Sequence, residues 1–274
     1  MTAFRPMTEI ENPTLPSSEE LVPDQPGEPL GEQPGEGIHA PTWEDDETPA
    51  TFVLRALATL LCGAFLAWSQ YNGGINSVLE WTRWIQMSVV ANLIFPLGII
   101  WFFFGQGIVH LDWLKDQRSN AWNYGWNFRA ARRHLKYSLI FTAAMLVIMV
   151  IFRLTPQGVL AAESYKNGYL PPILNARDVV MLLATLVLYM FCWEFFFRGF
   201  LLFGMAQGFG SIAAIGLQAA LFGAAHWGKP MEEFYSSFLG GALLGYVCWK
   251  EKSFAPAFYT HALIHVLWVI LVLL

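Results

Sequence analysis

Ionisable side chains stand inside long apolar segments in the last hundred residues of this 274-residue chain. A charged side chain at the centre of a bilayer costs about 2.5–3.5 kcal/mol on insertion, so residues of this kind are functional candidates. The earlier apolar segments hold almost none. The set comprises Glu194, Arg198, His226, His261 and His265, with Lys229 and Glu233 close to a predicted helix end.

Glu194 and Arg198 are four residues apart in the segment WEFFFRG. On a helix they share one face and can form an ion pair. In a low dielectric this pairing offsets much of the cost of inserting two charges. The pair by itself fits either a structural lock between helices or part of a reactive site.

The three histidines differ in their surroundings. His226 ends an apolar run, and Gly228 and Pro230 predict that the helix stops or kinks there, at a point that water reaches. His261 and His265 are four apart and share a face. Such a pair could bind zinc or donate hydrogen bonds to an oxyanion. The zinc interpretation is weak because the chain has no HExxH motif, and we predict no metal and no other cofactor.

Taken together, these side chains have the chemistry of a hydrolase. A carboxylate and an imidazole can activate a water, and further imidazoles can stabilise the oxyanion. The set therefore predicts cleavage of an amide bond within or beside the membrane. A membrane scaffold held together by the same residues is an alternative. A transporter or proton relay ranks last, because the chain lacks paired broken helices in two related halves.

The elements that position these residues are predicted from hydropathy. The hydrophobic fraction is 55% and the charged fraction 14%, whereas soluble proteins carry about 25% charged residues. A membrane-spanning helix needs about 20 apolar residues. We therefore predict an all-α, polytopic transmembrane bundle with about seven spans, near 52–70, 86–105, 137–153, 178–203, 209–227, 233–250 and 254–274.

The chain divides by composition into three parts. Residues 1–50 hold 12 of the 21 acidic residues and nine of the 15 prolines, which predicts a disordered tail that acts as a solvated spacer or docks a partner. Residues 51–177 contain the N-terminal transmembrane helices, and residues 178–274 contain the candidate core. The basic residues border apolar segments, so they indicate membrane orientation and no nucleic-acid binding.

A basic, Trp-containing segment at 106–136 is predicted to be an interfacial amphipathic loop in the cytoplasm. Lys250 and Lys252 fall on the same side, which makes the N-terminal tail cytoplasmic and places the C-terminus outside. The outer loop 154–177 contains three prolines and is predicted to be irregular. The six basic residues of the amphipathic segment are Lys115, Arg118, Arg129, Arg132, Arg133 and Lys136.

Small residues in the apolar segments are interpreted as packing residues. Cys62, Cys192 and Cys248 fit neither a zinc motif nor a disulfide framework, so we expect buried small hydrophobic side chains. A second group of small residues would allow close approach between helices. It consists of Gly240, Gly241 and Gly245.

About residues 178–270 resemble the CPBP intramembrane proteases, a family that includes the type II CAAX prenyl endopeptidases and the bacterial Abi proteins. That family carries the motifs EExxxR, FxxxH and HxxxN in this order. They stand here as WEFFFR (193–198), FGAAH (222–226) and HALIH (261–265). The resemblance implies an integral protein of a bacterial plasma membrane, with lipids and a membrane-associated peptide or protein as its partners.

The resemblance also implies a glutamate-dependent protease without an essential metal. In the family, the first-motif Glu and second-motif His activate the water, and the third-motif His and Asn stabilise the oxyanion. Carried over, His226 is the water-activating histidine and His261 an oxyanion donor. His265 replaces the Asn, and its N–H can donate as an amide does. Arg198 remains as the ion-pair partner.

Trp193 replaces the glutamate that the family uses as its base, and an indole cannot take a proton from water. Three outcomes follow. Glu194 takes the role, Glu233 reaches the site from another helix, or the chain is a catalytically silent relative that acts as a scaffold or binding protein. We predict an active intramembrane endopeptidase whose candidate catalytic residues are Glu194, Glu233, His226, His261 and His265.

Overall fold

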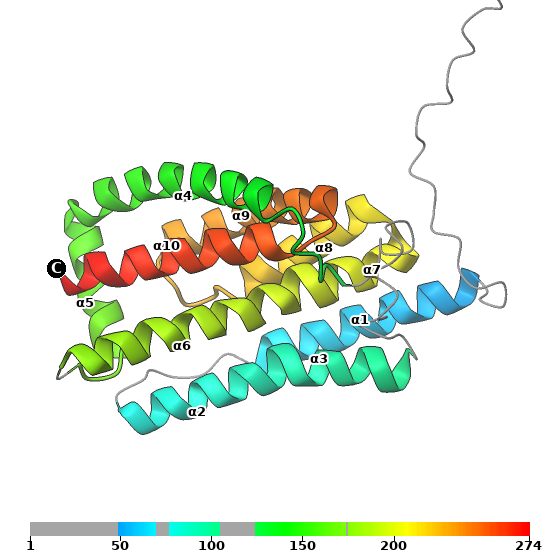
Figure 1. The fold of residues 1–274 in the computed structure, drawn as a ribbon, viewed down its shortest axis with the longest axis horizontal. Helices are drawn as coiled ribbons and strands as arrows, with labels where there is room; N and C mark the ends of the chain where they lie inside the picture. Colours follow the sequence, from blue (N-terminus) through cyan, green and yellow to red (C-terminus); the bar gives the residue numbers. More distant parts are fainter. Residues whose placement is uncertain (1–48, 70–76, 105–123, 174) are drawn as a thin grey trace, which may run out of the picture. The chain divides into compact units, whose positions relative to one another are not determined.

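Helices make up most of the part of the chain that the computed structural model describes, which is residues 49–69, 77–104, 124–173 and 175–274 (Figure 1). No strand occurs among these residues, which confirms the all-α prediction. The described helices belong to one compact unit, residues 41–274. The predicted disorder of the tail concerns residues that lie almost entirely outside the described ranges.

The N-terminal part contains three long helical segments. The second is one continuous rod in which α-helical and π-helical turns alternate between Val78 and Phe103. All three coincide with predicted spans, although the second and third begin six to eight residues earlier than predicted. The elements are α1 (Pro49–Ser69), α2 (Val78–Val89), η1 (Val90–Ile94), α3 (Phe95–Gly98), η2 (Ile99–Phe103) and α4 (Ala131–Arg153).

In the C-terminal part, helices occupy the places of the other four predicted spans, although only the first and the last of them qualify as membrane spans. Its first segment is again continuous, because α6, a π-helical segment and α7 follow one another without a break. A capping box between Asn175 and Asp178 starts α6. The elements are α6 (Ala176–Glu194), η4 (Phe195–Leu201), α7 (Leu202–Phe209), α8 (Ser211–Ala224), α9 (Met231–Glu251) and α10 (Ala255–Leu273).

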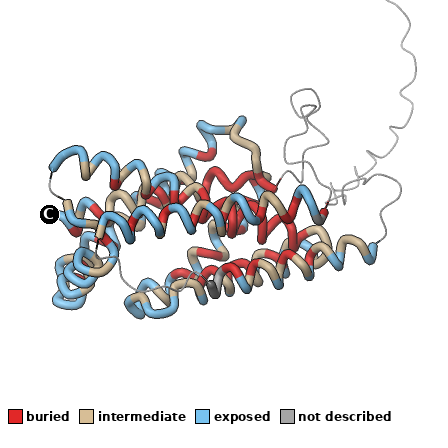
Figure 2. Tube along the Cα trace, turned by 90° about the horizontal axis from the view of Figure 1, so that it is seen from below, coloured by how far each residue is buried: buried red, intermediate tan, exposed pale blue. Residues whose placement is uncertain are grey.

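Five of these helical segments are long and apolar enough to cross a membrane: α1, the α2–η2 rod, α4, the α6–α7 rod and α10. The apolar α8 is shorter, with 14 residues. Many large apolar side chains on the outside of the bundle are exposed, whereas buried residues concentrate in its interior (Figure 2). This pattern suits a protein surrounded by lipid, and the chain is an integral membrane protein.

The segment between α4 and α6 corrects one prediction. Residues 154–177 were expected to be irregular, but α5 (Pro156–Tyr169) forms there. Thr155 caps its N-terminus by accepting a hydrogen bond from the Gly158 amide at 3.0 Å, and Pro156 occupies the first turn. A proline in this place favours a helix because its fixed φ is already helical and no amide is lost.

The described part of the basic segment 106–136, which includes Arg133, lies at the same end of the bundle as Lys250 and Lys252, as predicted, whereas Lys115 and Arg118 lie outside the described residues. Arg133 Nε is 2.6 Å from Glu251 Oε2, and the Phe254 amide donates to the Gly125 carbonyl at 3.1 Å. The described part of segment 106–136 is otherwise less loop-like than expected. Arg132, Arg133 and Lys136 belong to α4, and the Trp126 ring lies 5.3 Å from Phe195 and 5.5 Å from Phe254, within the aromatic core.

The small residues confirm the packing interpretation except at one position. Cys192 and Cys248 are buried and Cys62 is partly buried, all as free thiols. A Cβ on Gly241 would lie 3.2 Å from the Ala219 backbone, and one on Gly245 would collide with the Gln218 amide. A Cβ on Gly240 would have no neighbour within 4 Å, so close packing there was a wrong prediction. Gly240 lies on a different face of α9.

This difference gives a stability test within one helix. Gln218 cannot yield easily to a methyl group on Gly245, because its amide donates to the Gly241 carbonyl at 2.8 Å. We expect Gly245→Ala to lower the free energy of unfolding by about 1–3 kcal/mol through overpacking. The matched variant Gly240→Ala is expected to be neutral or slightly stabilising. Unfolding in mixed micelles measures both, and equal effects of the two variants would contradict the packing described for α8 and α9.

Candidate active site

The site begins where α6 becomes π-helical. Glu194 is the last residue of α6, and all seven residues of η4 after it are buried. Segments of π-helix occur frequently at functional sites. Gly199 permits the packing around this segment, because a Cβ there would lie 2.9 Å from the Tyr124 carbonyl oxygen and 2.7 Å from the Phe195 ring.

Glu194 and Arg198 form the predicted ion pair, and both side chains are completely buried. Arg198 Nη1 donates to Glu194 Oε1 at 2.9 Å and to Oε2 at 2.8 Å. The guanidinium also lies 3.9 Å from the centroid of the Phe222 ring, a cation–π contact. Both carboxylate oxygens are therefore engaged within the bundle.

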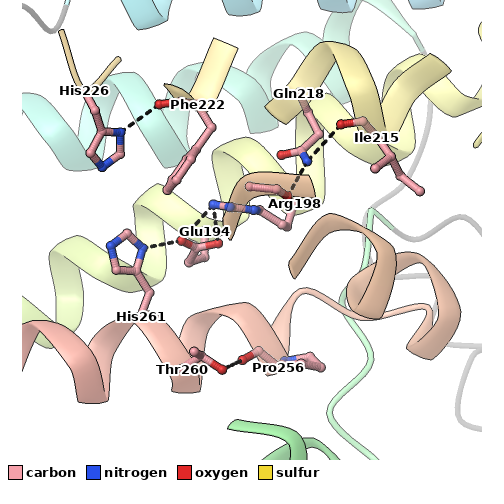
Figure 3. A network of polar contacts seen from close by, with 10 residues as sticks. Glu194, Arg198, Ile215, Gln218, Phe222, His226, Pro256, Thr260 and His261 are labelled. Atoms are coloured by element: carbon pink, nitrogen blue, oxygen red, sulfur yellow. Dashed lines mark hydrogen bonds and ion pairs between the residues drawn. The ribbon is translucent and has the colours of Figure 1, made fainter. Parts of the chain in front are cut away.

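His261 approaches the same carboxylate from α10. Its Nδ1 lies 2.6 Å from Glu194 Oε1, so Glu194 sits between Arg198 and His261 (Figure 3). The His261 side chain is 18% exposed and links the buried pair to a more accessible region. Hydrogen bonding at Nδ1 leaves Nε2 as the imidazole atom that faces away from the carboxylate. The carboxylate and the imidazole thus form a dyad across two helices.

His226 lies in the turn after α8, as the sequence predicted. Gly228 gives this turn its shape, because its φ of +87° lies in the region that glycine adopts without strain. His226 Nδ1 is 2.8 Å from the Phe222 carbonyl oxygen, which can only accept, so Nδ1 donates. Nε2 of His226 then carries the lone pair. The ring lies close enough to His261 to interact with it electrostatically.

His265 lies one turn beyond His261, with the two ring centroids 6.4 Å apart. Its Nε2 is 2.7 Å from the hydroxyl oxygen of Tyr165, which belongs to α5. The sequence reasoning missed Tyr165 because it treated residues 154–177 as an irregular loop. Tyr165 and Tyr169 are four residues apart, and this helical spacing was the signal that could have revealed them.

Lys229 and Glu233 lie near the rim of this group. Lys229 Nζ is 4.0 Å from the centroid of the Tyr169 ring, which ties the turn after α8 to α5. Glu233 is an exposed residue in the first turn of α9, and its charge acts on His226 and Tyr165. The structure thus brings Glu194, His261, His265 and His226 together and leaves Glu233 at the edge.

Trp193 stands at the position where the CPBP proteases have the glutamate that acts as general base. It forms part of the wall beside His226. Its side chain is only 6% exposed, and its ring centroid lies 6.3 Å from that of His226. Among the described residues, its Nε1 and the Nε and Nη2 atoms of Arg198 are buried without a hydrogen-bond partner. Native proteins leave few buried donors unpaired, so three such donors so close to the Glu194–Arg198 pair are unusual.

The arrangement is suited to proton transfer next to a buried charge. A carboxylate holds one imidazole, a second imidazole presents a lone pair nearby, and a third is bonded to a phenol. Within the described part of the chain, no group of three or more His, Cys, Asp or Glu side chains is placed to hold a metal ion.

Comparison with known proteins identifies the segment that carries these residues. Residues 175–267 match the family model described as type II CAAX prenyl endopeptidase, Rce1-like. Searches of the curated proteins and of the solved structures returned no match. The match confirms the predicted assignment to the CPBP proteases and covers the three motifs, whereas α1 to α5 lie outside it. Residues 175–267 of this chain are therefore a domain of the Rce1-like type II CAAX prenyl endopeptidase family.

Proposed function

We propose that the protein is an intramembrane endopeptidase that hydrolyses a peptide bond of a membrane-associated protein or peptide, with the Glu194–His261 dyad as its proton acceptor. The observation that carries this proposal is the 2.6 Å contact between His261 Nδ1 and the fully buried Glu194 carboxylate. A buried carboxylate fixes the tautomer of the imidazole beside it and stabilises the imidazolium that forms.

The first half of the reaction follows from the hydrogen bonds. His261 donates from Nδ1 to Glu194, so its Nε2 takes a proton from water while the oxygen attacks the scissile carbonyl carbon. His226 accepts the second water hydrogen at Nε2, because its Nδ1 proton is committed to the Phe222 carbonyl. Together the two imidazoles orient the attacking oxygen.

The second half of the reaction returns the proton. The carbonyl oxygen becomes an oxyanion, and the N–H of His265 stabilises it by hydrogen bonding. His261 then gives its proton from Nε2 to the leaving nitrogen, the carbon–nitrogen bond breaks, and a carboxylic acid and an amine result. No charge needs to leave the buried dyad during this cycle.

In this mechanism Glu194 has a different role from the glutamate that acts as base in the CPBP proteases. Arg198 and His261 engage both oxygens of Glu194, so Glu194 orients and stabilises His261 and does not itself take the proton from water. Glu233 is exposed on the first turn of α9 and is ill placed to be a buried base. His261 therefore has the role of base in this chain, in place of the oxyanion role that the resemblance implied.

A second candidate function is supported by Trp193. Its buried indole occupies the position of the family's base, which favours a catalytically silent relative that binds membrane peptides without cutting them. The two functions differ in what a carboxylate at this position would do. In a silent relative, Trp193→Glu creates hydrolysis that the natural protein lacks. In the dyad mechanism, the natural protein is already active.

The test uses purified full-length protein in liposomes and an internally quenched, farnesylated peptide that ends in a CAAX sequence, together with the same peptide without its prenyl group. We expect the natural protein to cleave one of them. Trp193→Phe and Glu233→Gln are expected to leave the rate within about threefold, because neither side chain transfers a proton in the reaction. Hydrolysis by Trp193→Glu alone would establish the silent relative and contradict the dyad.

The density of basic residues at the end of the bundle where Arg133 meets Glu251 supports a cytoplasmic position for that end and for the N-terminal tail. We propose a bacterial plasma membrane as its location, with lipids around the exposed apolar helices and the substrate peptide entering between them.

A further inference from the structure

Helix α5 supplies a side chain to the site from outside the family domain. It packs against α4 and α10 and lies at the end of the bundle where α10 ends (Figure 1). Tyr165 reaches from α5 to His265 with a hydroxyl-to-Nε2 distance of 2.7 Å. Its ring also meets the His265 ring edge-on, with centroids 6.1 Å apart. The contact joins residues that are 100 positions apart in the chain.

The hydroxyl of Tyr165 acts as the donor in this hydrogen bond. Helix α5 lies outside the five candidate spans, and burial there, reinforced by the Glu233 and Tyr169 side chains, raises the pKa of Tyr165 well above its ordinary value. The phenol therefore keeps its proton. A neutral imidazole nitrogen is a stronger acceptor than a phenol oxygen, so the proton of the hydroxyl points to His265 Nε2.

Donation from Tyr165 decides where His265 carries its own proton. A neutral imidazole holds one proton on one of its two nitrogens. When Nε2 accepts, the proton must sit on Nδ1. His265 then accepts on one side and donates on the other, as the side chain of an asparagine does with its oxygen and nitrogen. This is the behaviour that an oxyanion donor at position 265 requires.

We propose that Tyr165 is a positioning residue of the active site, which holds His265 in the Nδ1–H tautomer so that its N–H stabilises the oxyanion. The inference rests on the proposed hydrolysis. It also extends the working site beyond residues 175–267, since α5 precedes that segment. Tyr169 provides the matched comparison, because its ring stacks on Tyr165 at 5.4 Å and contacts Lys229, while no hydrogen bond joins its hydroxyl to a histidine of the described chain.

The first test reads the tautomer directly and does not depend on activity. Full-length protein labelled with ¹⁵N-histidine in lipid nanodiscs gives separate signals for protonated and unprotonated ring nitrogens, and His265→Asn identifies the signals of His265. We expect protonated Nδ1 and unprotonated Nε2 in the natural protein and in Tyr169→Phe, and a mixture of tautomers in Tyr165→Phe. A His265 tautomer that is the same in Tyr165→Phe as in the natural protein would refute the positioning role.

The second test uses the cleavage assay with the same quenched peptides. We expect Tyr165→Phe to lower kcat roughly tenfold with little change in KM, because the lost orientation matters in the transition state. In the His265→Asn background, Tyr165→Phe should have no further effect on kcat, since an amide has no tautomer to set. An equal loss in both backgrounds would show a merely structural role for Tyr165.

The two proposals fail in different ways. If the natural protein cleaves neither peptide, the proposed hydrolysis fails, and the tautomer measurement still decides whether Tyr165 positions His265. If the natural protein is active and Tyr165→Phe changes neither the tautomer nor kcat, the hydrolysis stands and the inference about Tyr165 is wrong.

Discussion

His261→Gln is expected to reduce the rate of peptide hydrolysis by roughly 10²–10⁴-fold, the range typical of losing a general base. The physical reason is that His261 is the imidazole held by the buried Glu194 carboxylate at 2.6 Å. Glutamine keeps a similar polar volume but cannot take a proton. Single-turnover cleavage of the quenched peptide in liposomes measures the effect without interference from product release.

Two further variants test whether the effect of His261→Gln is specific to the Glu194–His261 dyad. Glu194→Gln removes the charge that stabilises the imidazolium, so it should also slow hydrolysis, and the double variant should be no slower than His261→Gln because the dyad acts as a unit. His134→Gln is the matched control, since His134 is a completely buried histidine whose Nε2 lies 3.4 Å from a different carboxylate, Glu251. Full activity in His261→Gln would contradict the dyad mechanism.

Arg198→Met is expected to lower the free energy of unfolding by about 3–5 kcal/mol, the usual cost of removing one member of a buried ion pair. Arg198 Nη1 bonds to both oxygens of Glu194, and neither side chain is exposed. Methionine fills much of the space beneath Phe222 but leaves the carboxylate without its cation. Unfolding in mixed micelles, followed by tryptophan fluorescence, measures the loss.

A double variant tests whether the unpaired Glu194 charge causes the loss of stability in Arg198→Met. Glu194→Gln combined with Arg198→Met should be clearly more stable than the sum of the two single effects predicts, because no uncompensated charge remains. Arg153→Met provides the control, since Arg153 is only partly buried and donates a single long hydrogen bond of 3.3 Å to the Leu271 carbonyl. Additive losses in the double variant would show that packing of the Arg198 side chain, and not charge, dominates.

The sequence by itself determined the features that depend on neighbours along the chain. Lengths of apolar runs predicted seven spans, and helices occupy all seven places, but only five of the described helical segments are long and apolar enough to cross a membrane. The spacing of four residues predicted the Glu194–Arg198 pair and put His261 and His265 on one face. The glycine and proline after His226 predicted the end of α8. These predictions succeed because helical geometry fixes which residues meet within one or two turns.

Other features were decided by packing between helices that are distant in sequence. The sequence left open which histidine contacts Glu194, and the structure gives His261, which is 67 positions away. It gave no reason to separate Gly240 from Gly245, because only the approach of α8 distinguishes their faces. It also missed α5, since three prolines suggested a loop, although Pro156 stands where a proline starts a helix.

The ionisable set in the apolar C-terminal helices was therefore visible in the sequence, and so was its family order. Which carboxylate serves which histidine was not visible, because that depends on how α6, α10 and α5 cross in three dimensions. Local spacing determines pairs on one helix, whereas hydrogen bonds between helices depend on side-chain packing over the whole bundle. The Glu194–His261 dyad and the Tyr165–His265 contact belong to this second class, and the tertiary structure alone brought them together.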